Sequence, residues 1–251
     1  MKIKSVFKYS LTNMVKSIGA FYGIFISVCV LLIFLANSSG GTVSSSGVEL
    51  SSAIFIFIAG LNSFKENFYF MKSNNVSRRD FLYGTILSMI PIAFVMSFID
   101  IIVNRIYNLF IPSPTNYDMV YGNMRTLGIM TEVNKGIWVQ NNSIETLLNT
   151  FLFQGVVYAF AFALGFVITI LYYKSNKLTK VIISVAPVAL IVLLNLIIDI
   201  YPGILSGGIK FIQFIFGWNT LNPYAAILTF IISFISLSLI ARLLTKKVVL
   251  K

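Results

Sequence analysis

Six apolar stretches, separated by shorter polar segments, constrain this sequence more than any other feature. Hydrophobic residues make up 57% of the chain and charged residues only 11%, a balance outside the range of water-soluble domains. In lipid every backbone polar group must be satisfied internally, so each stretch is expected to form a helix. The sequence therefore predicts an all-α polytopic membrane protein, with residues 1–251 in a single transmembrane domain. The predicted spans are residues 18–36, 48–62, 81–103, 145–172, 178–200 and 223–244.

The basic residues are distributed unevenly among the segments that flank these spans. Fifteen of the nineteen Lys and Arg residues lie before the first span, after the second, after the fourth or after the sixth. Such residues are enriched on the cytoplasmic side of a membrane, so both termini and the segment after the second span are predicted to be cytoplasmic. We attribute the net charge of +11 to cytoplasmic loops that face anionic membrane lipid. We expect no nucleic acid partner. The abundance of Ile, Phe, Asn and Lys is typical of an AT-rich genome and favours a bacterial cell membrane.

The N-terminal segment, residues 1–16, carries four lysines and a set of apolar residues close to one helical face. A secretory signal would need a shorter apolar run and a small-residue cleavage site. An interfacial amphipathic helix that leads into the first span fits better.

The segment between the second and third spans, residues 64–84, is expected to form a short helix, a turn and the start of a membrane helix. Its apolar residues recur at the spacing of one helical face. That face consists of Phe64, Phe68 and Met71, whereas Lys65, Glu66 and Lys72 lie elsewhere around the helix. Asn74-Asn75 interrupts the pattern, because asparagine tolerates left-handed backbone geometry. Ser77 to Asp80 has the pattern of a capping box for the next helix.

This segment resembles the loop after the second membrane helix in permease subunits of ABC-2-type exporters. In that family an acidic residue on a short coupling helix precedes a Gly-Val-Ser-Arg-like turn into the third helix. The counterparts here are Glu66, Asn75-Val76-Ser77-Arg78, Phe81 and Gly84. The chain departs from the pattern at Asn67, where the family often has a basic residue, and at Asn75, which replaces the turn glycine. The resemblance implies that the residues coupling the chain to a separate ABC ATPase subunit are Phe64, Lys65, Glu66, Phe68, Met71, Ser77 and Arg78.

An alternative for the short helix is an interfacial position in which its aromatic face lies in lipid.

The region between the last two spans, residues 201–222, is interrupted by Gly203, Gly207 and Gly208. Residues 209–216 are too short to cross a bilayer of about 30 Å. We therefore expect a re-entrant or external helix there, and ABC-2-type permeases resemble the chain in this excursion too.

Small residues mark two candidate packing stripes. Gly19, Gly23 and Ser27 share one face of the first span, a spacing that lets membrane helices approach closely. Packing against another helix of the same chain is the preferred interpretation, and a seam between two subunits is the alternative. A second stripe consists of Gly155, Ala159 and Ala163.

Two acidic residues, Asp100 and Asp199, lie within predicted spans, each toward the end that is expected to be external. An intramembrane acid is a functional candidate by default, but near the interface we interpret each as a hydrated helix end. Asn195 lies one turn before Asp199 on the same face.

Several kinds of chemistry are excluded from the chain by its residue types. The sequence has no His and a single Cys, Cys29, so zinc or haem sites and His-dependent catalysis are not expected. No Gly-Lys-Ser/Thr closes a glycine-rich turn, so the chain has no nucleotide-binding loop of that type. We expect no enzyme activity and no cofactor in this chain, with ATP and Mg²⁺ on the partner ATPase.

The resemblance implies the membrane subunit of an ATP-driven exporter, in which two six-helix subunits, alike or different, form the pathway. An amphipathic or hydrophobic cargo such as a peptide, drug or lipid-like molecule is expected, because the spans offer apolar surface and few fixed charges. The alternatives are a secondary transporter, which should have charged or broken helices at the midplane, and another polytopic membrane protein without an ATPase partner.

Overall fold

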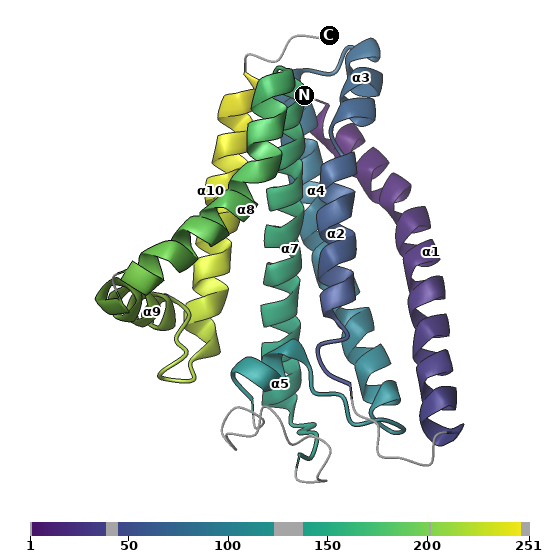
Figure 1. Ribbon diagram of the computed structural model, residues 1–251. Coiled ribbons are helices and arrows are strands. Elements are labelled where there is room, and N and C mark those ends of the chain that lie inside the picture. Colours follow the sequence, from purple (N-terminus) through teal and green to yellow (C-terminus); the bar gives the residue numbers. More distant parts are fainter. Residues whose placement is uncertain (1, 39–44, 123–137, 201, 247–251) are drawn as a thin grey trace.

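All regular structure in the described part of the chain is helical. The computed structural model describes residues 2–38, 45–122, 138–200 and 202–246, which contain no strand (Figure 1). The helices are α1 (Ile3–Ser38), α2 (Leu50–Asn62), α3 (Lys65–Ser73), α4 (Arg78–Tyr107), α5 (Asn116–Val120), α7 (Ile144–Lys174), α8 (Lys177–Ile200), α9 (Pro202–Ile215) and α10 (Pro223–Thr245). The predicted all-α class is thereby confirmed for these residues.

Five of these helices are long and apolar enough to cross a membrane: α1, α4, α7, α8 and α10. The chain is therefore described as a helical membrane protein. The second expected span corresponds to α2, which has only 13 residues and a length of about 20 Å at 1.5 Å per residue. It is shorter than a hydrocarbon core of about 30 Å, so the six-span layout remains a prediction.

The N-terminal segment and the first expected span form one continuous helix, α1, of 36 residues. A helix of this length extends for about 54 Å, well beyond the thickness of the hydrocarbon core. The basic first turns of α1 can therefore leave the bilayer without a break. A separate interfacial helix is not present.

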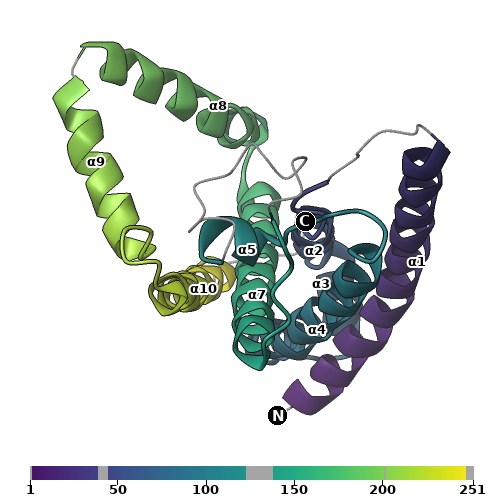
Figure 2. The ribbon, with the colours of Figure 1, turned by 90° about the horizontal axis from the view of Figure 1, so that it is seen from below.

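The core of the molecule lies where α2, α4 and α7 pack together, with α1 against α4 and α10 against α7 (Figures 1 and 2). The backbones of α2 and α7 approach closely because glycines face each other. A Cβ atom on Gly60 would collide with the Phe162 carbonyl, and one on Gly165 would collide with the Phe57 carbonyl. Gly155, Ala159 and Ala163 also face the inside of the bundle, so this stripe packs within the chain.

α8 and α9 extend away from the bundle, and the chain returns to it through α10 (Figure 2). Except for the partly exposed Ile183, the described apolar side chains of α8 are exposed. α9 continues through Gly203 to Gly208, so the prediction that these glycines interrupt the segment is wrong. The expected helix between the last two spans exists, but it begins at Pro202.

Side-chain caps fix where several helices begin. The hydroxyl of Ser77 accepts a hydrogen bond from the Asp80 N–H at the start of α4, and Ser143 does the same for Thr146 in α7. Asn222 caps α10, whose first residue is Pro223. A proline at this position does not destabilise the helix, because the N–H group that it lacks would have no partner within the helix.

The segment between α4 and α7 contains regular structure in its described part. α4 continues to Tyr107, and α5 begins with a complete capping box between Thr115 and Asp118. α5 lies over the end of α7 opposite α3 (Figure 1). Residues 104–107 and 116–120 are therefore helical, while residues 123–137 lie outside the described ranges.

Candidate functional site

The predicted short helix exists as α3, and its apolar face is buried inside the chain. Phe64, Phe68 and Met71 are 0%, 1% and 5% exposed. The Phe64 and Phe68 rings stack on each other at 5.0 Å, and Phe68 meets the edge of Phe81 in α4 at 5.5 Å. Tyr173 of α7 packs against Phe64 at 5.5 Å. This face therefore anchors α3 to α4 and α7.

Two sequence-based expectations about this face are corrected by its burial. The Phe64, Phe68 and Met71 side chains are not available to a groove on another protein, and they do not lie in lipid. The most exposed residues of α3 are Lys65, Glu66, Phe70 and Ser73. Phe70 stacks on Tyr9 of α1 at 5.1 Å, yet 49% of its side chain remains exposed.

The turn from α3 into α4 has the predicted backbone geometry. Asn75 has a φ of 54°, the left-handed conformation that asparagine tolerates better than most residues. The carboxylate of Asp80 accepts a hydrogen bond from the backbone N–H of Lys2 at 3.0 Å, so the expected capping box is only half formed. Arg78 donates to the carbonyl of Lys246 at 2.9 Å. Ser77 and Arg78 thus connect the start of α4 to the chain around it.

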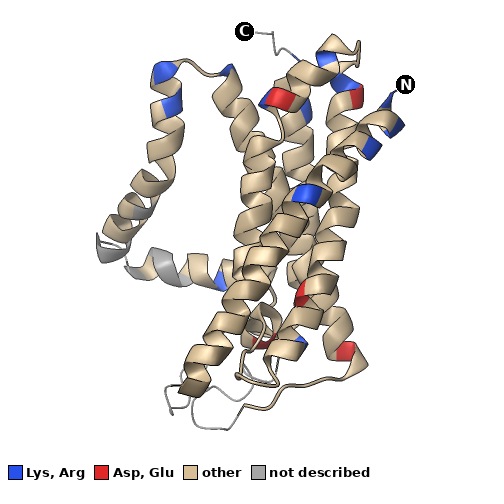
Figure 3. Cartoon of the chain, turned by 90° about the vertical axis from the view of Figure 1, so that its right-hand side faces the viewer, with Lys and Arg blue, Asp and Glu red and all other residues tan. Residues whose placement is uncertain are grey.

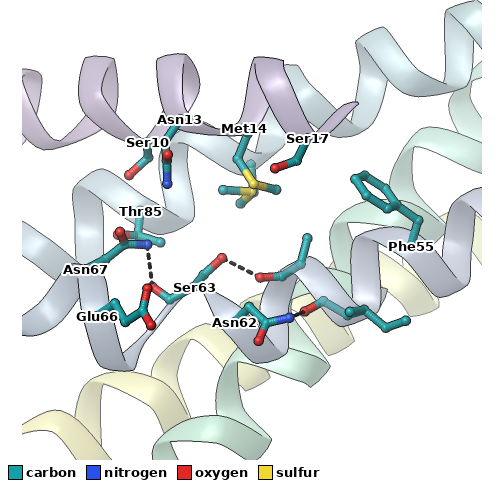
Figure 4. A pocket seen from close by; sticks show the side chains of 13 residues that line it. Ser10, Asn13, Met14, Ser17, Phe55, Asn62, Ser63, Glu66, Asn67 and Thr85 are labelled. Carbon is teal, nitrogen blue, oxygen red and sulfur yellow. Dashed lines mark hydrogen bonds between the residues drawn. The ribbon is translucent and has the colours of Figure 1, made fainter. Parts of the chain in front are cut away.

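A polar cavity of about 280 Å³ opens beside α3, between α1, α2 and α4 (Figure 4). Its lining includes Ser10, Asn13 and Ser17 of α1, Asn62 and Ser63 at the end of α2, Glu66 and Asn67 of α3, and Thr85 of α4. In Figure 4, Ser10 and Asn13 lie across the cavity from Glu66 and Asn67. The cavity and the exposed face of α3 form one continuous candidate site.

The lining of this cavity favours a ligand that donates hydrogen bonds or carries positive charge. Glu66 is the charged residue in the lining, and no Lys or Arg belongs to it. The hydroxyl of Thr85 is buried without a hydrogen-bond partner in the described structure, and such a group is costly unless a water or ligand reaches it. A guanidinium, ammonium or amide group would find complementary oxygens here.

The sequence predicted Glu66 as a site residue, but it did not predict most of the other residues that line this cavity. Ser10, Asn13 and Thr85 are isolated polar residues on separate helices, and one sequence contains no signal that brings them together.

The first small-residue stripe does not pack within the chain. A Cβ atom added to Gly19 or Gly23 would meet no atom within 4 Å, and Ser27 is exposed with its hydroxyl bonded to the Gly23 carbonyl. The preferred interpretation, packing against another helix of the same chain, is therefore wrong. The alternative, a seam with a second subunit, remains a prediction.

Asp100 is a fully enclosed residue rather than a hydrated helix end, since it is 1% exposed. Its Oδ1 accepts hydrogen bonds from Tyr22 of α1 at 2.9 Å and Ser52 of α2 at 3.0 Å. Its Oδ2 accepts one from Tyr158 of α7 at 2.5 Å. The hydrated-end interpretation is therefore wrong for Asp100, which joins four helices. The side chain of Asp199 lies outside the described residues.

Within the described residues, no cluster of three His, Cys, Asp or Glu side chains has the arrangement of a metal site. Cys29 is buried and unpaired. No protein-family model, curated protein or solved structure matches the chain.

Proposed function

We propose that this chain is the membrane-spanning subunit of an ATP-driven exporter of the ABC-2 type. The observation that carries the proposal is the exposed polar face of α3, with Lys65 and Glu66, beside the 280 Å³ polar cavity. Most Lys and Arg residues lie toward this end of the bundle (Figure 3), as expected for a cytoplasmic end. A separate ATPase subunit, which holds ATP and Mg²⁺, would dock here.

The burial of the aromatic face supports a rigid coupling element. Because Phe64 and Phe68 fix α3 to α4 and α7, a displacement of α3 by an ATPase would be transmitted directly to two long helices. Glu66 at the rim of the cavity would pair with a basic or amide group of the ATPase, while Lys65 would meet an acidic one. In this proposal α2, with 13 residues, is the second of six spans.

A second subunit, identical or different, would complete the pathway in a bacterial cell membrane. The exposed stripe of Gly19, Gly23 and Ser27 supports a seam on α1, because helices in lipid associate through small residues. The apolar surfaces of the spans suit an amphipathic or hydrophobic cargo. We assign no individual side chain to the cargo.

The proposal is tested by co-expressing the full-length chain with an ATPase encoded beside it and measuring retention of the ATPase on the purified chain. Glu66→Arg should reduce retention at least tenfold, because a charge-assisted contact is replaced by repulsion. Glu145→Arg, the same change at an exposed acid at the start of α7, serves as the control. Wild-type retention by Glu66→Arg, or absence of any such ATPase gene, would count against the proposal.

One observation favours the alternative of a secondary transporter. Asp100 and Glu49 are both enclosed within the bundle, each 1% exposed, and enclosed acids of this kind are used in ion-coupled transport. Transport by the purified chain alone in proteoliposomes, driven by an ion gradient and without ATP, would favour this alternative over the exporter.

A further inference from the structure

The interior of the polar cavity beside α3 plays no part in the proposed docking of an ATPase, which needs only the rim. The cavity has a volume of about 280 Å³, close to that of the smaller pockets that take small ligands. Polar and apolar atoms contribute about equally to its wall. The cavity therefore suits a ligand that has both a polar and an apolar part.

Aromatic contacts hold α1 to its neighbours on either side of the cavity. Tyr9 of α1 stacks on Phe70 of α3 at 5.1 Å. Phe21 of α1 stacks on Phe55 of α2 at 4.4 Å. The part of α1 that lines the cavity falls between these two contacts, within residues 10–17. The cavity is therefore a space defined by the packing of α1 against α2 and α3.

The lining of the cavity changes from polar to apolar with distance from α3. On α2, Asn62 and Ser63 line the cavity at the end that leads into α3, and Phe55 lines it about two turns away. On α4, which begins beside α3, Thr85 is followed about one turn later by Met89. A ligand with one polar end would therefore bind with that end toward α3.

The polar wall at the end of α2 offers hydrogen-bond acceptors. The side-chain amide of Asn62 donates to the Ile58 carbonyl at 3.0 Å. The amide of Asn67 donates to the Ser63 carbonyl at 3.1 Å (Figure 4), and the Ser63 hydroxyl donates to the Ala59 carbonyl. Donors of all three side chains are thus used within the chain, while their oxygens keep acceptor positions for a ligand.

Glu66 adds a negative charge to this wall, and Thr85 adds a buried hydroxyl. Glu66 lies across the cavity from Ser10 and Asn13 (Figure 4). Thr85 is 2% exposed, and its hydroxyl has no hydrogen-bond partner in the described structure. No Lys or Arg belongs to the lining, so a phosphate group would find no opposite charge there. An ammonium group, which has three N–H donors, would find a carboxylate and neutral acceptors.

We propose that this cavity is a binding site for a primary amine that carries an apolar chain. The ammonium group lies near α3 and donates to Glu66 and the neighbouring side-chain oxygens, while the chain lies against Phe55 and Met89. A quaternary ammonium lacks the N–H donors, and a phospholipid headgroup carries a phosphate that the lining does not neutralise. The assignment goes beyond the proposed function, because binding of the amine requires no ATPase.

The experiment measures saturable binding of radiolabelled octylamine to the purified full-length chain in phosphatidylcholine nanodiscs, without an ATPase. Binding to empty nanodiscs is subtracted, because an alkylamine also partitions into lipid. Octyltrimethylammonium has the same charge and chain but no N–H donor, so it should compete about tenfold more weakly than unlabelled octylamine. Absence of saturable binding, or equal competition by the two compounds, overturns the proposal.

Glu66→Gln removes the charge and keeps the size of the side chain, so it should weaken octylamine binding about tenfold. Glu66 is exposed, so the variant is expected to fold. Glu145→Gln, at an exposed acid of α7, is the matched control and should bind octylamine as the wild-type chain does. Unchanged affinity of the Glu66→Gln chain overturns the proposal.

The result is separable from the test of the proposed function. No ATPase is present in the binding measurement, so a failure to bind octylamine leaves the docking surface of α3 unaffected. Conversely, wild-type ATPase retention by Glu66→Arg would count against docking without changing the octylamine affinity of the wild-type chain.

Discussion

Tyr158 shows how much a single hydroxyl can contribute inside this bundle. It is 1% exposed and donates to Asp100 at 2.5 Å. Tyr158→Phe leaves one oxygen of a buried carboxylate without its donor, and such a loss costs about 1–3 kcal/mol. We expect the free energy of unfolding, measured by denaturant titration in detergent, to fall by that amount.

The matched control is Tyr9→Phe. The Tyr9 hydroxyl makes a longer hydrogen bond, 3.4 Å to Asn67, in a half-buried position, so its removal should cost less than about 1 kcal/mol. Equal losses in the two variants would contradict the role given to Asp100 as the junction of four helices. The sequence placed Asp100 correctly along its helix, but the hydroxyls that surround it lie 48 to 78 residues away, and no local pattern connects them.

Packing between elements is tightest where α2 crosses α7. Gly165→Leu would drive a side chain into the Phe57 carbonyl and toward the Leu61 N–H, which lies 3.0 Å from an added Cβ atom. Backbone atoms cannot move aside as a flexible side chain can. We therefore expect the free energy of unfolding to fall by more than about 3 kcal/mol. Gly23→Leu, where the added group meets open space, should leave the unfolding midpoint of the monomeric chain unchanged. Comparable destabilisation by both changes would argue against the close approach.

The two faces of α3 should respond differently to truncation. Phe68→Ala removes a ring that is 1% exposed and should cost about 3–5 kcal/mol of folding stability. Phe70→Ala, on the half-exposed side of the same helix, should cost far less and instead weaken ATPase retention. Thermal unfolding and retention are measured on both variants. Loss of retention by Phe68→Ala in a chain of unchanged stability would restore the original docking assignment.

The helix ends and the burial of α3 differ in how far the sequence predicts them. Ser77 and Asn75 define the turn into α4 through local backbone chemistry, which a sequence displays directly. The period of Phe64, Phe68 and Met71 correctly predicts an amphipathic helix. What covers that face includes Tyr173, which is distant in sequence. Likewise, the glycines of α9 predicted a break, but glycine weakens a helix without necessarily ending it.

At the scale of the assembly, the exposed stripe on α1 should determine whether two chains associate. Gly23→Leu places a large side chain where close approach needs a small one. We expect the dimer dissociation constant in lipid nanodiscs or bicelles to rise at least tenfold, while Val15→Leu, at an exposed position of the same helix, leaves it unchanged. Unaltered association of the Gly23→Leu chain would remove α1 from the seam.

The orientation of the whole molecule is tested by labelling from outside intact cells. Fifteen of the nineteen basic residues lie in the four segments predicted to be cytoplasmic, because such residues are enriched on that side of a membrane. A cysteine at Asn142, exposed before α7, should therefore react with a membrane-impermeant maleimide, whereas one at Ser73, exposed at the end of α3, should react only after permeabilisation. The native Cys29 is buried and is replaced by serine to remove background. The reverse pattern would place α3 outside the cell, where no ATPase could reach it, and the proposed function would fail together with the orientation.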